Sequence, residues 1–163
     1  MLRHPGAVRS AVLHEPAMIS VVADPAAAQA SVAAAIQEGV AQGGPPGAVD
    51  RFFRPVAGDA TWDRVPTDLR NRITSNGETL LGMELGTFEA YRPGDSAFAG
   101  ITTPTHVLVS ENSPGVFHEV AAWLSGRAGF EVVRTPGSHT PQFDHPDELV
   151  RTIRPLLRGR GRT

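Results

Sequence analysis

The 163-residue sequence contains no cysteine, which excludes disulfide bonds, zinc sites built on thiolates and catalysis by a thiol. It also contains no apolar run long enough to cross a membrane. The first 25 residues lack the charged start, apolar middle and small-residue cleavage site of a signal peptide. We therefore expect a cytoplasmic protein that has no membrane partner.

Clustered positive charge is scarce as well. The formal net charge is -2, all 15 basic residues are arginine, and the only basic run is the segment 157–163. Because a nucleic-acid surface needs clustered positive charge, we expect no nucleic-acid partner. The hydrophobic fraction of 40% and the charged fraction of 20% are typical of a globular chain with one core.

Three short apolar runs predict buried strands at residues 8–13, 105–110 and 131–134. A helix is predicted after the second strand, from the N-cap Ser113 to Gly126, and another after the third strand, at 147–157. The last helix is expected to bury its apolar residues Leu149, Val150, Ile153, Leu156 and Leu157. Because strands that alternate with helices pair in parallel through right-handed crossovers, the sequence predicts an α/β fold with about three parallel strands and flanking helices.

A long helical insertion is predicted between the first two strands. Its first helix begins at the N-cap Asp24, which a proline follows, and ends at the glycine pair 43–44. Residues 45–66 mix proline, glycine and single aromatics without a period, so we expect irregular structure there, with at most one helical turn. Two further helical segments follow within 66–91 and are separated near Asn76.

His139 lies in a Pro-Gly-Ser turn, directly behind an apolar strand and ahead of a helix. An imidazole at the carboxyl end of a strand can face a cleft, where its near-neutral pKa suits general-base chemistry. A histidine with no role beyond the turn is the alternative. Asp144 and His145 follow closely, but their spacing matches no common set of metal ligands and helix capping accounts for them. We therefore expect no metal site.

Three stretches, "LRHPGAVRSAVLHEP", "THVLVSENSP" and "VVRTPGSHTPQFDHPDELVRTIRPLLR", resemble the C-terminal half of an α/β-hydrolase-fold enzyme, in that family's order. The resemblance implies a partial α/β-hydrolase fold whose predicted strands are the sixth, seventh and eighth of eight. It places the core in 1–25 and 93–163 and a helical cap in 26–92. It makes His139 the catalytic histidine of a hydrolase that uses neither a metal nor an organic cofactor.

The resemblance further implies a small, apolar, ester-like substrate. Met83 and Phe88, in the strongly apolar second segment of the cap, are candidates to line its pocket, although such residues more often form a packed core. The family often places the triad acid after the seventh strand, where this chain has Ser113. Some relatives carry the acid at the end of the sixth strand instead, so Glu15 is the first choice of acid and Glu111 the alternative.

The nucleophile motif of that family, Gly-x-Ser-x-Gly, does not occur in this sequence, and "GDSAFAG" around Ser96 does not match it. We therefore expect a C-terminal half whose nucleophile and oxyanion-hole donors lie outside the chain, and which is inactive alone. Two alternatives stay open. In the first, the chain is a non-catalytic fragment that acts as a binding module or dimerises with a second copy. In the other, a separate polypeptide supplies the missing half of the sheet.

Overall fold

Three parallel strands form one sheet in the order β1 (Ala11–His14), β2 (Thr105–Ser110) and β3 (Glu131–Thr135). This confirms the predicted fold class. The first strand begins at residue 11 rather than 8, because the ladder reaches Pro104, whose carbonyl accepts from the N–H of residue 11 at 2.9 Å but which has no N–H of its own.

The computed structural model of the chain describes residues 7–94 and 96–157. Most of the basic run found in the sequence, 158–163, lies outside these residues. No helix in the described ranges combines the length and the apolar character that a membrane crossing requires.

The chain divides into two units. Unit 1 comprises Met1–Ala17 and Arg92–Thr163 and contains the sheet, whereas unit 2 comprises Met18–Tyr91 and is helical. The segment predicted as a cap, 26–92, overlaps unit 2, and its role as a cap stays a prediction.

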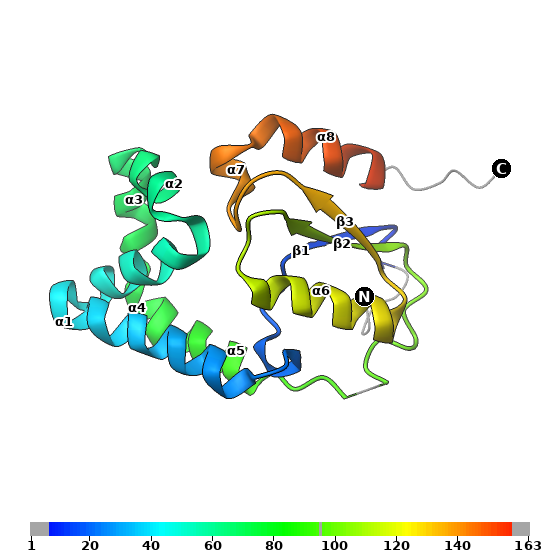
Figure 1. Ribbon diagram of the computed structural model, residues 1–163, viewed down its shortest axis with the longest axis horizontal. Coiled ribbons are helices and arrows are strands. Elements are labelled where there is room, and N and C mark those ends of the chain that lie inside the picture. The colour runs from blue at the N-terminus through cyan, green and yellow to red at the C-terminus, as the bar shows by residue number, and fades with distance from the viewer. Residues whose placement is uncertain (1–6, 95, 158–163) are drawn as a thin grey trace. The chain divides into compact units, whose positions relative to one another are not determined.

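In unit 1, helices α6 (Gly115–Ala128) and α8 (Pro146–Leu157) lie on opposite faces of the sheet (Figure 1). Helix α6 packs on β2 and β3, and α8 packs on β1 and β3. A short helix, α7 (Pro141–Asp144), precedes α8. The buried core of the unit is formed mainly by apolar side chains of β2 and α6, namely Val107, Leu108, Val109, Phe117, Val120 and Leu124.

Helix α6 differs from its predicted limits at both ends. Pro114, not Ser113, occupies the N-cap position, and no side chain caps the helix there. Gly126 lies inside the helix, which ends at Gly129, where φ is 67° and the N–H donates to the Ser125 carbonyl at 3.0 Å. Glycine adopts this left-handed conformation without the steric cost of a Cβ atom.

Helix α8 buries less of its apolar surface than the sequence predicts. Val150 and Leu157 are 50% and 52% exposed. At 3.6 residues per turn they lie about 80–100° around the helix from Leu149, on the flank of the face that meets the sheet. The prediction that all five apolar residues are buried is therefore wrong. Leu149, Ile153 and Leu156 are half-buried, because the helix contacts the sheet through a narrower stripe.

Unit 2 begins with the short helix η2 (Ile19–Val21) and continues with the long helix α1 (Pro25–Ala57). The Asp24 side chain caps α1 by accepting the N–H of Ala27 at 2.9 Å, as its position before the proline suggests. The remaining elements are α2 (Asp59–Arg64), α3 (Thr67–Thr74), α4 (Gly77–Thr79), the π-helical turn η3 (Leu80–Glu84) and α5 (Leu85–Ala90).

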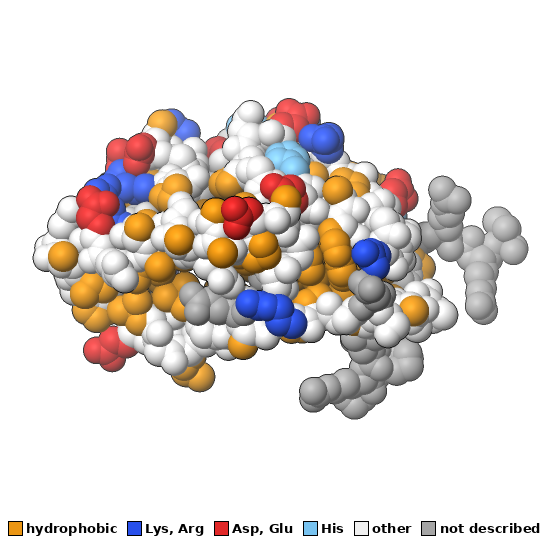
Figure 2. All heavy atoms as spheres, turned by 60° about the horizontal axis from the view of Figure 1, so that its bottom comes forward, with side chains coloured by type: hydrophobic (Ala, Val, Ile, Leu, Met, Phe, Trp, Pro, Cys, Tyr) orange, Lys and Arg blue, Asp and Glu red, His pale blue; other side chains and the backbone are white. Residues whose placement is uncertain are grey.

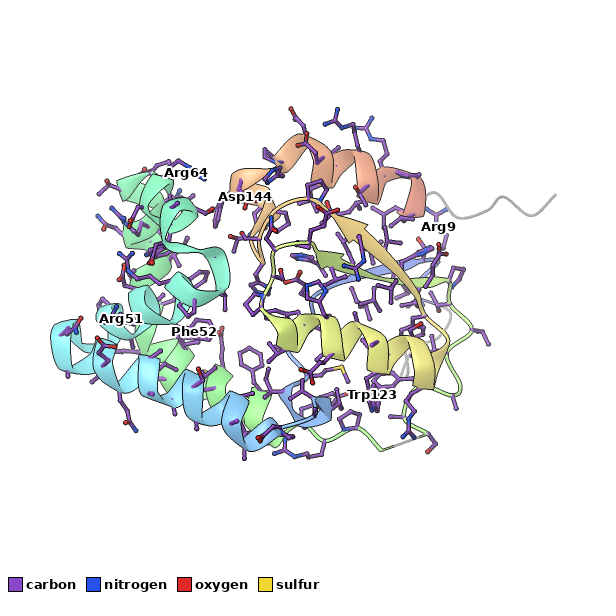
Figure 3. The ribbon with its side chains drawn as sticks, in the orientation of Figure 1. Arg9, Arg51, Phe52, Arg64, Trp123 and Asp144 are labelled. Atoms are coloured by element: carbon purple, nitrogen blue, oxygen red, sulfur yellow. The ribbon has the colours of Figure 1, made fainter. Side chains whose placement is uncertain are left out.

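The glycine pair 43–44 interrupts α1, and the helix then resumes. The expectation of irregular structure in 45–66 is therefore wrong. That expectation rested in part on Pro45 and Pro46. Both lie in the first turn after the kink, where a helix needs no N–H donors. An ion pair between Glu38 and Arg51 joins the two halves (Arg51 is labelled in Figure 3).

The two halves of α1 approach each other closely beyond the kink. A Cβ atom added to Gly39 would lie 2.3 Å from the Gly47 carbonyl oxygen, so only glycine fits at this crossing.

Trp62 of α2 is buried, stacks on Phe53 at 4.9 Å between ring centroids, and donates its indole N–H to Asp50 at 2.8 Å. Hydrophobic side chains also reach the surface along α1 (Figure 2).

Candidate active site

Glu15 directly follows β1 and has a backbone conformation that is unusual for glutamate. Its φ of 42° lies in the left-handed region, where the described residues otherwise include only glycines. Its N–H still donates to the Leu108 carbonyl at 3.0 Å, so the ladder continues up to the point where the chain turns. Such a conformation costs about 1–3 kcal/mol and persists where the surroundings fix it, often at functional sites.

The Glu15 carboxylate is buried and accepts from three groups. Its Oε1 accepts the N–H of Ser110 and the hydroxyl of Ser113, each at 2.6 Å, and its Oε2 contacts Nδ1 of His139. Burial raises the pKa of the Glu15 carboxyl, but the hydrogen bonds from His139, Ser113 and Ser110 outweigh burial and hold the pKa below its ordinary value. The group is therefore ionised at neutral pH.

The His139 ring is fixed on one edge and one face. An ionised carboxylate only accepts hydrogen bonds, so the contact with Glu15 assigns the proton to Nδ1 and leaves Nε2 for acid–base chemistry. The ring stacks on Phe117 of α6 with centroids 4.2 Å apart and planes 11° apart. About a quarter of the side chain, 26%, is exposed to solvent.

A second imidazole, that of His14, lies beside the first. The rings of His14 and His139 are stacked with centroids 5.9 Å apart. Nε2 of His14 lies 3.3 Å from the Ser110 hydroxyl oxygen and 3.7 Å from Oε1 of Glu15. Burial lowers the pKa of His14, Glu15 opposes this effect, and His139 adds to it, so the pKa is below its ordinary value.

The carboxylate of Asp144 is held close to the turn that carries His139. Its Oδ2 accepts the N–H of Ser138 at 3.0 Å, and its Oδ1 lies 3.2 Å from Nδ1 of His145. Asp144 thus contacts the preceding turn instead of capping a helix as predicted. Within the described ranges, no three His, Asp or Glu side chains converge as metal ligands would, and the expectation of no metal stays a prediction.

A family model described as the alpha/beta hydrolase family matches residues 1–152. The chain belongs to the alpha/beta hydrolase family. Comparison with curated proteins and with solved structures gives no significant match. The resemblance found in the sequence is confirmed, the three-stranded sheet is a partial fold of this family, and membership supports a hydrolase-type function.

Of the two acids proposed for this hydrolase, Glu15 contacts the histidine. Glu111 is solvent-exposed, and its backbone N–H pairs with the Thr135 carbonyl at 2.9 Å. Ser113 occupies the position where the family often has the acid, and its hydroxyl donates a hydrogen bond to the carboxylate of Glu15. The catalytic roles of His139 and Glu15 stay predictions.

The two predicted substrate contacts lie in unit 2. Met83 belongs to the π-helical turn and is 70% exposed, whereas Phe88 belongs to α5 and is half-buried. Their roles stay predictions. Sequence reasoning missed His14 and Phe117 as neighbours of His139. The one signal in the sequence that could have located either of them is the position of His14, directly before the proposed acid at a strand end.

Proposed function

We propose that His139 is the general base of a hydrolytic reaction and that Glu15 orients its ring and stabilises its charged form. The observation that carries the proposal is the contact between Nδ1 of His139 and the buried carboxylate of Glu15. In the Ser-His-Asp arrangement a buried carboxylate has this role on this nitrogen, holding the ring in the productive tautomer.

The neighbouring contacts support the same roles. Because Nδ1 holds its proton against Glu15, Nε2 is the nitrogen that takes a proton from an attacking hydroxyl and returns it to the leaving group. Stacking on Phe117 restricts rotation of the ring out of this plane. The donors Ser110 and Ser113 keep the carboxylate ionised, which favours the imidazolium that forms during the reaction.

The residues around His139 and Glu15 do not include a nucleophile that a substrate could reach. Ser110 lies beside His14 as a nucleophile lies beside a base, but it is 0% exposed, so no substrate reaches its hydroxyl. The Ser113 hydroxyl donates to Glu15. With no Gly-x-Ser-x-Gly in the sequence, we infer that the chain contributes the base and its acid, while the nucleophile comes from elsewhere.

The substrate class follows from the family and from unit 2. We infer a small, apolar, ester-like molecule, with Met83 and Phe88 as candidate contacts, and no metal or organic cofactor. A cytoplasmic location is retained as a prediction. The alternative function, a binding or dimerising module without catalysis, is supported by β1, which pairs on one side only within the described residues.

Proton NMR of the 15N-labelled chain tests the proposed pair. The Nδ1 proton of an imidazole that donates to a buried carboxylate resonates far downfield. We expect such a signal in the wild-type chain, its loss in His139→Gln, and an upfield shift in Glu15→Gln. The matched control, Glu111→Gln, should leave it unchanged. A signal that Glu15→Gln does not move would remove Glu15 from the role of acid.

A fluorophosphonate probe tests the inference about the nucleophile. We expect mass spectrometry to find no modified serine in the chain alone, and nitrophenyl butyrate to show no turnover that depends on His139. A serine whose modification disappears in His139→Gln would place the nucleophile inside the chain and contradict that inference.

A further inference from the structure

The turn that carries His139 is tied down at two successive residues. The Gly137 carbonyl accepts the N–H of Asn112, at 3.0 Å, from the loop that follows β2. The N–H of Ser138, directly before the histidine, donates to Oδ2 of Asp144 at 3.0 Å. Because the Gly137 carbonyl and the Ser138 N–H belong to the same peptide unit, the two hydrogen bonds hold that unit from both sides, directly before His139.

The carboxylate of Asp144 fits closely between the turn and the start of α8. Its side chain is only 8% exposed, and His145 faces its second oxygen at 3.2 Å. Figure 3 shows Asp144 at α7, beside the turn that follows β3. The same carboxylate thus links the turn to the segment where the last helix begins.

Gly137 makes this approach possible. Its φ of 101° is open to glycine alone, and a Cβ atom at this position would lie 2.7 Å from Oδ1 of Asp144 and 2.9 Å from Nδ1 of His145. The side chains of residues 144 and 145 therefore occupy the space that a side chain at position 137 would need.

We propose that Asp144 is a positioning residue that holds the His139 turn in register with Glu15. The inference rests on the proposed function, since His139 needs a fixed orientation only if its ring exchanges protons. Without an acceptor for the Ser138 N–H, the peptide between residues 137 and 138 is held only through its carbonyl, by Asn112, and its rotation carries the imidazole of His139 away from Oε2 of Glu15.

The charge state of Asp144 agrees with this role. Burial raises the pKa of the Asp144 carboxyl, but the Ser138 N–H and His145 outweigh burial and hold the pKa below its ordinary value. The side chain is therefore an acceptor at neutral pH and does not compete as a donor for the peptide groups of the turn.

Three variants of the whole chain test the proposal through the downfield Nδ1 proton of His139. Asp144→Ala removes the acceptor, whereas Asp144→Asn keeps an oxygen that the Ser138 N–H can reach. Asp147→Ala removes an exposed carboxylate from the first turn of α8 and is the matched control. The amide signals of β2 and α6 report in each variant whether unit 1 is folded.

We expect the Nδ1 signal to vanish in Asp144→Ala, to return in Asp144→Asn and to persist in Asp147→Ala. A folded Asp144→Ala chain with an unchanged signal would overturn the proposal. So would a signal lost in Asp144→Asn while the amide signals are retained, because the acceptor would then not be the property that matters. If Asp144→Ala does not fold, Asp144→Leu, which fills the space but offers no acceptor for the Ser138 N–H, takes its place in the same comparison.

The failure of the proposed function gives a different pattern. If His139 is not a base, the Nδ1 signal still responds to Asp144 as expected, but no assembly that contains the chain shows hydrolysis that depends on His139. If only the positioning inference fails, such hydrolysis is present and Asp144→Ala leaves its kcat unchanged.

Discussion

The Ser113 hydroxyl and Oε1 of Glu15 lie 2.6 Å apart, although 98 positions separate the two residues in the chain. The same oxygen accepts the N–H of Ser110, so both donors on this side of the carboxylate come from the end of β2 and the loop after it. The other oxygen is left to His139. The loop that often carries the acid in this family here supplies one donor, Ser113, to a carboxylate that follows another strand.

Replacing Ser113 with alanine should destabilise the fold. The buried carboxylate loses one of its three donors, and a hydrogen bond to a charged group contributes about 1.5–3 kcal/mol. Urea unfolding measures the loss, with Ser113→Thr as the variant that retains a hydroxyl. Equal midpoints for Ser113→Ala and wild type would mean that water replaces the serine at no cost.

Activity should depend on Glu15 and not on Glu111. In an assembly that includes the nucleophile, Glu15→Gln is expected to lower kcat by about 10⁴-fold, the effect of the corresponding change in the Ser-His-Asp triad. Glu111→Gln should be nearly silent, and Ser113→Asp should partly restore activity to Glu15→Gln. The reverse ranking of the two glutamates in a turnover assay would return the acid to the loop after β2.

Stability should fall as the solution becomes acidic, in two stages. The pKa of His14 is below its ordinary value of 6.5, so the unfolded chain binds this proton first and stability declines as pH falls below that value. The pKa of Glu15 is below 4.5, so its contribution is present above that pH and is lost as pH falls through the folded-state pKa.

Calorimetric midpoints measured across this pH range separate the two groups. His14→Gln should remove the first stage, and Glu15→Gln should weaken the second. A midpoint that rises on acidification from neutral pH would contradict the assignment to His14, and one that rises below pH 4.5 would contradict the assignment to Glu15.

The glycine at the crossing inside α1 should not tolerate alanine. In Gly39→Ala the new methyl group meets the Gly47 carbonyl oxygen at 2.3 Å, and overpacking of this kind costs about 1–3 kcal/mol or more. Gly82→Ala is the control, because nothing lies within 4 Å of its Cβ position, and it should be neutral or stabilising. Thermal unfolding of the two variants compares them, and equal midpoints would refute the close approach.

The open side of β1 should promote association. Ala11 and Glu15 both direct their N–H groups to acceptors on the β2 side, so strand alternation places the Val12 N–H on the side without a partner strand in the described residues. We expect wild-type chain to self-associate in sedimentation velocity and Val12→Pro, which lacks that N–H, to do so less. Val12→Thr keeps the N–H and serves as the control. A wild-type monomer at all concentrations would count against this edge as a contact surface.

Local sequence patterns predicted a helix or strand well where a short stretch of one residue type, or a cap residue before a proline, sets the backbone conformation. The apolar runs located all three strands, and Asp24 followed by proline located the start of α1. The helix after Gly44 was missed, because prolines that stop a helix from inside are harmless in its first turn. Whether Pro45 and Pro46 interrupt a helix or begin one depends on the position of the kink. The kink is fixed by packing between the two halves of α1.

The sequence predicted the histidine of the candidate site, but it predicted the residues around that histidine less well. A family pattern led to His139 and offered Glu15, but the choice between Glu15 and Glu111 needed the turn at φ 42°, which sequence periodicity does not encode. Ser113 was taken for a helix cap, since a serine before a proline suits that role. Its hydroxyl instead serves a carboxylate that is brought close only by the pairing of β1 with β2.

The left-handed backbone at Glu15 has a consequence for mutational tolerance. At a φ of 42° the backbone itself favours glycine, asparagine or aspartate, whereas the contact with His139 needs a carboxylate at the reach of a glutamate. In a library of all substitutions at this position, screening for folded protein and screening for hydrolysis should therefore enrich different residues. Variation at position 15 among natural homologues would accordingly record whether a lineage has kept the chemistry or only the fold.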